Sequence, residues 1–599
     1  MWTPIEDYAL LADGRAAALV SRTGAIEWLC IPRFDHAAAM AAMLGDEQHG
    51  MWVVAPVNGP RTTERAYRDG GMVLDTTIAA DDGTIRITDC MPPTTDDPCV
   101  IRRVEGLEGS TRVHVQIVMS MDYGTMRPVV RHEDGRVLAL AGPDGLAIDA
   151  DIELLQHEQS TVADVTVEAG ESFTIVLNHY ESSQAPPPPL ADPGAVIDDA
   201  ERWWRDWSDQ LEFDGDYADE LERSMLVLKA MIYAPTGGIV TSPTTSLPEE
   251  LGGQRNWDYR YCWMRDSALS MYVLMLGGCH DEVRAWRRWL VRTTTARANK
   301  LQPVFGPAGE RRIDERTAHW LPGYEGSTPV NLGNGAGQQF QLDAYGEVVD
   351  ALYAADKLGL EPDEEAWAFQ KDVADFLQDH WTRPGQGIWE LRGPPRQYVH
   401  SKLMAWVAID RVIRSAEEFG HDVDDETLLD WKELRETIRQ EIEERGWNEE
   451  IGAFTQVYGG QDLDAALLLM PQTGFLPPDD ERVVSTVEAI QRELVRDGWI
   501  WRFDNNAVDD GLSGGEGAFI ACQCWLADAL FMMGREDEAR ETFERVLEVS
   551  NDLGLLSEEY DPRPARLLGN FPLALTHLAV ANAIHNFSGE GPAHHRAGL

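Results

Sequence analysis

The sequence changes character at Gln184-Ala185-Pro186-Pro187-Pro188-Pro189-Leu190-Ala191-Asp192-Pro193-Gly194. Four consecutive prolines can continue neither a helix nor a central strand, and a proline-rich segment forms a stiff connector. Short, strand-like apolar segments precede this stretch, and longer segments with helical periodicity follow it. We therefore predict a β domain over residues 1–183, a linker over 184–198, a helical domain over 199–590 and a mobile tail over 591–599.

The part before the connector is predicted to form an all-β sandwich. Its apolar stretches are short, alternating or β-branched, and Gly, Asp and Asn turn residues separate them. The clearest of these predicted strands cover residues 16–20, 25–30, 51–54, 84–88, 112–119 and 161–167.

The part after the connector is predicted to be helical, because apolar residues recur at i, i+3 and i+4. Twelve such segments are compatible with a bundle, a solenoid or a ring of paired helices. The sequence shows no repeat of fixed length, which counts against a solenoid. The predicted helices cover residues 197–211, 217–232, 265–276, 281–298, 338–358, 363–380, 400–419, 425–445, 479–495, 517–533, 535–549 and 572–586.

The chain is strongly acidic, with 102 Asp and Glu against 51 Lys and Arg and a formal net charge of -51. A surface of this charge repels nucleic acid and anionic lipid, so neither is an expected partner. Repulsion between like charges also destabilises the compact state unless salt screens it, and at 1 M salt the Debye length is about 3 Å. We hypothesise a salt-adapted, halophilic-type protein; an acidic protein from a GC-rich genome is the alternative.

The cysteines and the N-terminus indicate a cytoplasmic protein. Seven cysteines without a C-x-x-C pair favour free thiols in a reducing compartment over disulfides or a thiolate zinc site. Glu6, Asp7 and Asp13 lie where a signal peptide would be apolar. No run of about 18 apolar residues predicts a membrane span.

Four loop segments between the predicted helices combine aromatic, acidic and glycine residues, namely 256–266, 387–392, 555–561 and 321–327. Aromatic rings pack against sugar rings, and charged side chains bind hydroxyl groups. A glutamate beside a tryptophan, as at Trp389-Glu390, is a candidate general acid because desolvation raises its pKa. A helix N-terminus, a surface ion pair, a solvated acidic loop and a tight turn are the respective structural alternatives.

Other chemistries are poorly represented. The sequence contains no phosphate-binding P-loop, no H-E-x-x-H zinc motif and no nucleophile elbow. The glycine-rich stretch 514–517 does not follow a strand, as a dinucleotide-binding loop requires. We predict neither a metal nor a cofactor.

Taken together, these segments resemble glycoside hydrolase family 15, the glucoamylases and their bacterial and archaeal relatives. The resemblance extends over nearly the whole chain, and its order and spacing are more specific than any single motif. It rests on residues 4–8, 24–35, 243–249, 257–266, 341–347, 389–390 and 558–561. It implies an N-terminal β-sandwich followed by an (α/α)6 barrel, and hydrolysis with inversion that releases β-glucose from a non-reducing end.

The resemblance also implies roles for individual residues. Glu390 matches the general acid and Glu558 the general base, with Glu559 as the alternative base. An inverting enzyme needs these two carboxyl groups about 6.5–9.5 Å apart, so that a water molecule fits between them. The resemblance further implies that the substrate-binding residues are Arg265, Asp266, Trp263, Tyr324 and Trp389.

The resemblance implies an α-glucoside as the substrate, and several activities remain open. We expect a glucoamylase-type, exo-acting α-glucosidase first, with a trehalase of the same family as the alternative. A disaccharide phosphorylase, which has no need of a base at Glu558, is a more distant possibility. A non-catalytic sugar-binding protein is a fourth interpretation, and the oligomeric state stays open.

Overall fold

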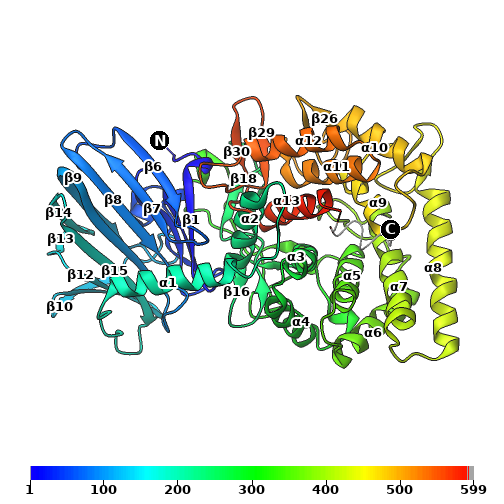
Figure 1. Ribbon diagram of the computed structural model, residues 1–599, viewed down its shortest axis with the longest axis horizontal. Coiled ribbons are helices and arrows are strands. Elements are labelled where there is room, and N and C mark those ends of the chain that lie inside the picture. Colours follow the sequence, from blue (N-terminus) through cyan, green and yellow to red (C-terminus); the bar gives the residue numbers. More distant parts are fainter. Residues whose placement is uncertain (1, 590, 592–599) are drawn as a thin grey trace.

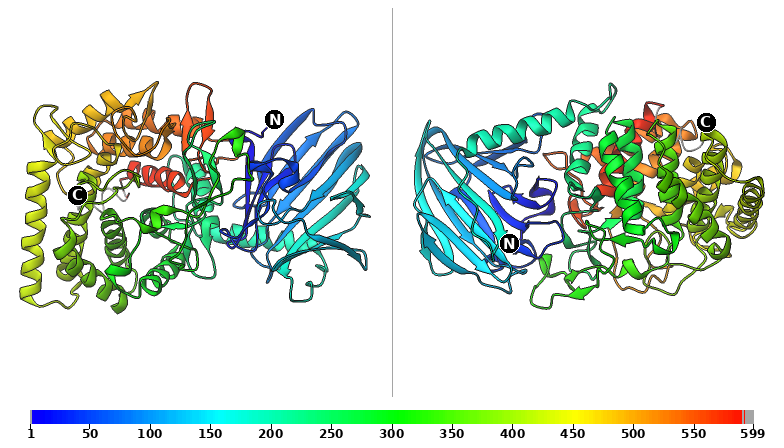
Figure 2. Two further views of the ribbon diagram at one scale, coloured as in Figure 1. Left: turned by 180° about the vertical axis from the view of Figure 1, so that it is seen from behind. Right: turned by 90° about the horizontal axis from the view of Figure 1, so that it is seen from below.

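The computed structural model describes residues 2–589 and 591. It has a β domain at one end of its long axis and a helical domain at the other (Figures 1 and 2). Nearly all of the predicted tail, 592–599, lies outside the described residues.

The predicted β domain is present, and its 15 strands are connected by hydrogen bonds through one long, shared strand. The strand β9 (Cys99–Val118) is this shared strand, since its first half pairs with β8 and β15 and its second half with β5 and β14. The other strands are β1 (Tyr8–Ala12), β2 (Ala17–Ser21), β3 (Ala25–Cys30), β4 (Ala38–Met40), β5 (Met51–Pro56), β6 (Thr62–Tyr67), β7 (Leu74–Ala79), β8 (Gly83–Cys90), β10 (Val129–Glu133), β11 (Arg136–Ala141), β12 (Asp144–Ala150), β13 (Leu155–His157), β14 (Ser160–Glu168) and β15 (Ser172–Glu181).

Burial along the strands shows which faces are covered. In β7, buried residues alternate with half-buried ones, as expected when one face of a sheet packs on a core. By contrast, β1 and β2 are buried at every residue, so both of their faces are covered.

The connector is shorter than the predicted linker 184–198, because helix α1 (Pro193–Ser208) already begins at Pro193. Proline is favoured in the first turn of a helix, where its missing N–H leaves no hydrogen bond unmade. Asp192 caps this turn, and its carboxylate accepts a hydrogen bond from the N–H of Ala195 at 3.0 Å. From there α1 runs along the sheet toward the helical domain (Figures 1 and 2).

All twelve predicted helices are present, and α9 is an additional short one. Their bounds after α1 are α2 (Ala218–Met231), α3 (Met264–Leu276), α4 (His280–Thr294), α5 (Asp343–Lys357), α6 (Glu364–His380), α7 (Val399–Phe419), α8 (Asp425–Arg445), α9 (Met470–Thr473), α10 (Glu481–Leu494), α11 (Ile520–Met532), α12 (Glu536–Glu548) and α13 (Ala574–Phe587).

The helices divide into a buried set and an outer set. The helices α3, α5, α7, α9, α11 and α13 contact one another in this order, and α13 contacts α3 again. The helices α4, α8 and α12 each pack against one member of this ring, and α2 and α6 each pack against two neighbouring members. The helix α10 packs against the 3-10 helix η7 (Ala465–Leu469), which precedes α9. Ring helices such as α5 and α11 are buried on almost all sides, whereas α8 buries one narrow stripe, as a surface helix does.

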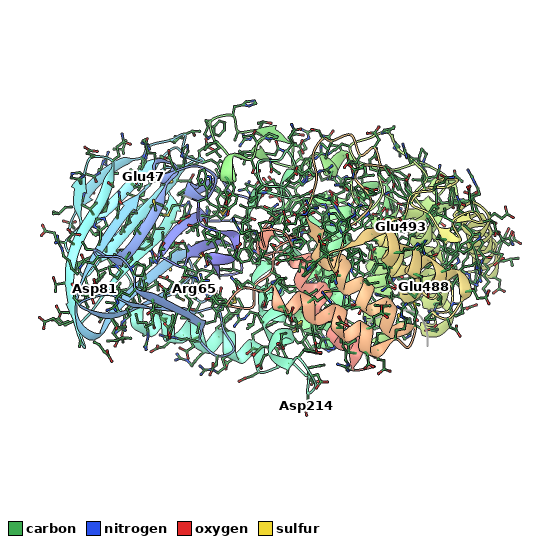
Figure 3. All side chains as sticks on the ribbon, turned by 90° about the horizontal axis from the view of Figure 1, so that it is seen from above. Glu47, Arg65, Asp81, Asp214, Glu488 and Glu493 are labelled. Atoms are coloured by element: carbon green, nitrogen blue, oxygen red, sulfur yellow. The ribbon has the colours of Figure 1, made fainter. Side chains whose placement is uncertain are left out.

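Polar contacts join the two domains. Arg65 on β6, labelled in Figure 3, forms an ion pair with Asp552 at 2.5 Å, between α12 and α13. The indole of Trp28 on β3 donates a hydrogen bond to the carbonyl oxygen of Pro243 at 2.9 Å. The sheet therefore supports the inter-helix loops on its side of the helical domain.

The outside of the protein carries many acidic side chains. Asp81, Asp214 and Glu493 are exposed, and Figure 3 shows Asp214 at the edge of the molecule. All seven cysteines are buried free thiols, as predicted. Among the described residues, no helix has both the length and the apolar character needed to span a membrane.

Candidate active site

A pocket lies where loops enter the N-terminal ends of the ring helices. We call its inner part, which contains both predicted glutamates, the inner compartment. The positive ends of α3, α11 and α13 meet there, which favours negatively charged groups nearby. The inner compartment is lined by Thr241, Tyr259, Trp263, Arg265, Ile388, Trp389, Glu390, Arg502, Phe519, Glu558, Leu573 and Leu575.

Glu390 lies in the inner compartment on the loop between α6 and α7. Its backbone has a φ of 60°, in the left-handed region that a glutamate seldom adopts and that occurs often at functional sites. The indole of Trp263 donates a hydrogen bond to its carboxylate at 2.5 Å, and Arg265 lies 3.5 Å from the same oxygen. Burial raises the pKa of Glu390, and the charge of Arg265 counteracts this shift.

Glu558 lies in the same compartment, just before the strand β29 (Glu559–Asp561). The hydroxyl of Tyr259 donates a hydrogen bond to its Oε1 at 2.8 Å, whereas its buried Oε2 has no partner. Burial, and then the charge of Glu249, raise the pKa of Glu558 to about 8. The structure therefore brings both predicted glutamates into one pocket and leaves one carboxylate oxygen without a hydrogen bond.

The neighbouring Glu559 is also buried but does not line the inner compartment. Its Oε2 accepts a hydrogen bond from the N–H of Gly517 at 2.7 Å, and its Oε1 lies 3.8 Å from Arg502. Burial and the charge of Glu249 raise its pKa well above the usual range. Of the two adjacent glutamates, Glu558 is the one at the pocket.

Arg265 and Asp266, predicted as a pair, are in direct contact at the start of α3. Arg265 donates to Asp266 at 2.6 Å and to the carbonyl oxygen of Ile388 at 2.8 Å. Asp266 also accepts a hydrogen bond from Thr241 at 2.8 Å. Only Arg265 lines the compartment, and Asp266 holds its guanidinium in place from behind.

The extended segment 256–263, with β19 (Asn256–Asp258) and β20 (Cys262–Trp263), positions the aromatic side chains of the pocket. Successive side chains of an extended chain point to opposite sides. Trp257, Tyr259 and Trp263 thus reach the pocket, while Asp258 and Arg260 point the other way.

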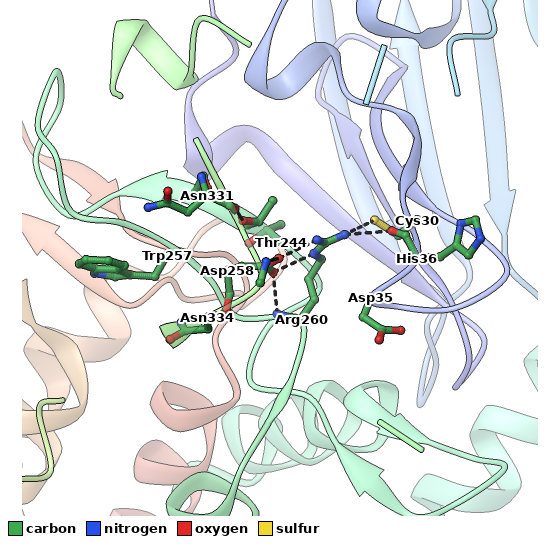
Figure 4. Close-up of polar contacts among 12 residues, drawn as sticks. Cys30, Asp35, His36, Thr244, Trp257, Asp258, Arg260, Asn331 and Asn334 are labelled. Carbon is green, nitrogen blue, oxygen red and sulfur yellow. Dashed lines mark hydrogen bonds and ion pairs between the residues drawn. The ribbon is translucent and has the colours of Figure 1, made fainter. Parts of the chain in front are cut away.

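The side chain of Arg260 anchors this segment to the β domain (Figure 4). Its guanidinium pairs with Asp258 at 2.7 Å and donates to the carbonyl oxygen of His36 at 2.9 Å. Both charged side chains are almost fully buried, so the contact fixes the segment firmly. This link explains how the β domain contributes to the geometry of the pocket.

A second part of the pocket, which we call the outer compartment, adjoins the inner one. It shares Tyr259, Trp389, Glu390 and Arg502 with the inner compartment, so Glu390 stands where the two meet. Its remaining lining residues are Glu249, Arg255, Trp257, Asn334, Leu391, Arg392, Asp510 and Leu512.

The structure places Tyr324 away from the pocket, contrary to our prediction. Its ring is fully buried, and its hydroxyl donates a hydrogen bond to the carbonyl oxygen of Thr3 at 2.8 Å. The turn at Gly323, with a φ of 78°, directs the ring toward the β domain, where it stacks with Trp2. The turn interpretation of 321–327 is therefore the correct one. Trp389 does line both compartments, as predicted.

Sequence reasoning missed several lining residues. Tyr259 lies within a segment that we singled out, and period-two alternation with Trp257 would have identified it. Arg502 gave no signal, because it lies in a loop without a recognised motif. The structure places its guanidinium 3.1 Å from Glu249, 2.5 Å from Glu516 and 3.8 Å from Glu559.

These three glutamates lie close enough together to hold a metal ion. Arg502 already supplies a positive charge among them, so the arrangement is a buried ion-pair network.

Comparisons with known proteins show the family of this chain. The family model for glycosyl hydrolases family 15 matches residues 215–585, and the model for a trehalase-like N-terminal domain matches residues 1–195. The chain is 34% identical to a trehalase of Mycobacterium tuberculosis, over 97% of this chain and 89% of that protein. It is 32% identical to a trehalase of Thermoplasma volcanium, over 96% of this chain and 92% of that protein.

The crystal structure of a bacterial glucoamylase complexed with acarbose has the same fold. It superposes with a TM-score of 0.75 over 99% of this chain and 95% of that chain, at 13% identity. The predicted resemblance is confirmed, and the chain belongs to glycoside hydrolase family 15.

Proposed function

We propose that this glycoside hydrolase is a trehalase that cleaves α,α-trehalose with inversion of configuration. The observation that carries the proposal is the division of the pocket into two small compartments that meet at Glu390. Glu390 lines both compartments and Glu558 lines the inner one, so a glycosidic bond held between the compartments would lie beside both carboxyl groups. We infer that each compartment takes one of the two sugar rings of trehalose.

The relatives support this choice over our first expectation, a glucoamylase-type enzyme acting on glucans. Both trehalases align over nearly their whole length, including the β domain. The bacterial glucoamylase is far less similar in sequence and supports the shared fold alone. The alternative that we put second is thus the better supported one.

The proposed reaction begins with one glucose ring in the inner compartment and the other in the outer compartment. Glu390, protonated because burial raises its pKa, donates its proton to the glycosidic oxygen as the bond to C1 breaks. Ionised Glu558 takes a proton from a water molecule, whose oxygen attacks C1 from the opposite face. The products are one β-glucose, from the inner ring, and one α-glucose, whose anomeric carbon keeps its oxygen.

The side chains around the inner ring have distinct proposed roles. The guanidinium of Arg265, held by Asp266, donates hydrogen bonds to sugar hydroxyl groups. Trp263 and Trp389 offer aromatic surface to the sugar. Tyr259 holds Glu558 in position through its 2.8 Å hydrogen bond.

The packing of the helices supports an (α/α)6 barrel as the scaffold of this site. Six helical segments follow one another in a closed ring, and outer helices cover it. We infer that the loops at one end of this barrel, where the ring helices begin, form the active site.

A comparison of substrates tests the proposal. We expect kcat/KM to be highest for trehalose when trehalose, maltose, isomaltose and soluble starch are compared at 0.1 M and 2 M KCl. A higher kcat/KM for starch or maltose would instead identify a glucoamylase-type α-glucosidase. Formation of glucose 1-phosphate, only when phosphate is present, would identify a phosphorylase instead.

A further inference from the structure

The outer compartment is closed on one side by residues 509–515, a stretch that we call the strap. Asp510 and Leu512 of the strap line this compartment together with Trp389 and Leu391. The carbonyl oxygen of Asp510 accepts a hydrogen bond from the N–H of Arg392 at 2.9 Å. The strap thus lies directly on the loop that carries Glu390.

One buried ion pair fixes the strap. Asp510 accepts a hydrogen bond from Arg255 at 2.6 Å, and both side chains are 4% exposed. Within 509–515, which the structure describes throughout, Asp510 is the single buried residue. Other side-chain hydrogen bonds of the strap are exposed to solvent, such as the 3.1 Å hydrogen bond between Ser513 and Gln254.

The fit between the strap and the opposite loop leaves little room. Gly511 has a φ of 82°, and a Cβ atom at this position would lie 2.9 Å from the carbonyl carbon of Arg392. A side chain is therefore excluded here, and the strap approaches the loop backbone as closely as glycine allows.

We propose that the Arg255–Asp510 ion pair determines chain-length specificity, because it holds the strap across the outer compartment and excludes a third sugar ring. The proposal rests on the proposed function, in that it explains why the site takes a disaccharide. Removing one partner leaves the other charge buried without compensation, which is strongly unfavourable. The Nε of Arg255 already has no hydrogen-bond partner. The strap then moves away so that water reaches the remaining charge, and the compartment opens.

The test compares pairs of substrates that differ by one ring: trehalose with trehalose bearing one α-1,4-linked glucose, maltose with maltotriose, and isomaltose with isomaltotriose. The quantity measured is the ratio of kcat/KM for the longer to that for the shorter substrate. We expect Asp510→Asn and Arg255→Gln each to raise this ratio by about tenfold or more, the lower end of what exclusion by a pocket achieves. The double variant, with two neutral amides that can hydrogen-bond, should restore part of the discrimination.

Asp509→Asn is the matched control, since Asp509 is an exposed acidic residue of the same strap whose carboxylate accepts only from the N–H of Gly511. This variant should leave the ratio unchanged. The proposal is overturned if the wild type accepts both members of each pair equally, or if the single variants leave the ratio at the wild-type value.

Hydrogen exchange tests the release of the strap even if a variant loses all activity. Amides 511–517 should exchange faster in Asp510→Asn than in the wild type, and unchanged exchange contradicts the proposal. The experiment measures two independent preferences of the enzyme: which glycosidic linkage it cleaves, and whether it prefers two-ring to three-ring substrates. A wild type that ignores trehalose but prefers maltose to maltotriose refutes the trehalase assignment and supports the role of the strap.

Discussion

Replacement of Glu558 by Gln distinguishes the proposed general base from the adjacent Glu559. The substitution keeps the size of the side chain and the hydrogen bond from Tyr259, but it removes the group that takes a proton from water. A positioned general base contributes roughly 10²–10⁴-fold to the rate, so kcat/KM should fall by that factor. Glu559→Gln is the control, and we expect a loss below about tenfold, because Glu559 lies behind the pocket lining.

The pH dependence of kcat/KM provides a second test of the role of Glu558. The value of kcat/KM reports the pKa of groups in the free enzyme, and the pKa of Glu558 is raised to about 8. Because the pKa of Glu558 is raised, the acidic limb of the wild-type kcat/KM profile should lie at higher pH than an ordinary glutamate would give. The variant should lose this limb.

The assay measures initial glucose release from trehalose between pH 5 and 9, together with urea unfolding of each variant. A Glu558→Gln enzyme that keeps more than a tenth of wild-type activity would refute the assignment. A larger loss in Glu559→Gln than in Glu558→Gln would transfer the role of base to Glu559.

Three further predictions concern charge. Glu249→Gln removes a negative charge that raises the pKa of Glu558, so the acidic limb of the kcat/KM profile should move to lower pH, and an unmoved limb contradicts this coupling. Burial raises the pKa of Asp528 from 3.8 to about 7, so its contribution to stability is complete below about pH 4 and is lost as the pH rises through 7, at a cost on the order of 4 kcal/mol. In Asp528→Asn, the free energy of unfolding should therefore change less between pH 5 and 8 than in the wild type, and equal changes would show that Asp528 titrates normally. With a net charge of -51, the protein should unfold at higher temperature in 2 M than in 0.1 M KCl, and a flat response would speak against salt adaptation.

Most of the fold could be predicted from the sequence, because helices and the domain boundary depend on residues that are close together in the chain. Helical periodicity located all twelve long helices, and the proline run located the boundary between the domains. The connection of the strands through β9 was not predictable, since it depends on how β9 divides its partners between two halves. Pro193 was assigned to the linker because proline breaks helices, although it also begins them.

The candidate site was predicted where a motif identified its residues. Glu390, Glu558, Arg265 and Trp389 all line the inner compartment, although long stretches of sequence separate them. Tyr324 was wrong, because nothing in 321–327 shows which way its ring turns.

Long-range contacts account for the residues that we did not predict. Arg502 pairs with Glu249, and Asp510 pairs with Arg255. In both pairs the partner lies far away in the sequence. Such partners become evident only once the chain is folded.

The stereochemistry of trehalose cleavage tests the proposed mechanism most directly. Proton NMR of the first glucose released, before the anomers equilibrate, should show α- and β-glucose in equal amounts. Inversion at one anomeric carbon produces the β-anomer, and the other ring keeps its α-configuration. Release of α-glucose alone would show retention and contradict the roles of Glu390 and Glu558, and no release from trehalose would contradict the proposed function itself.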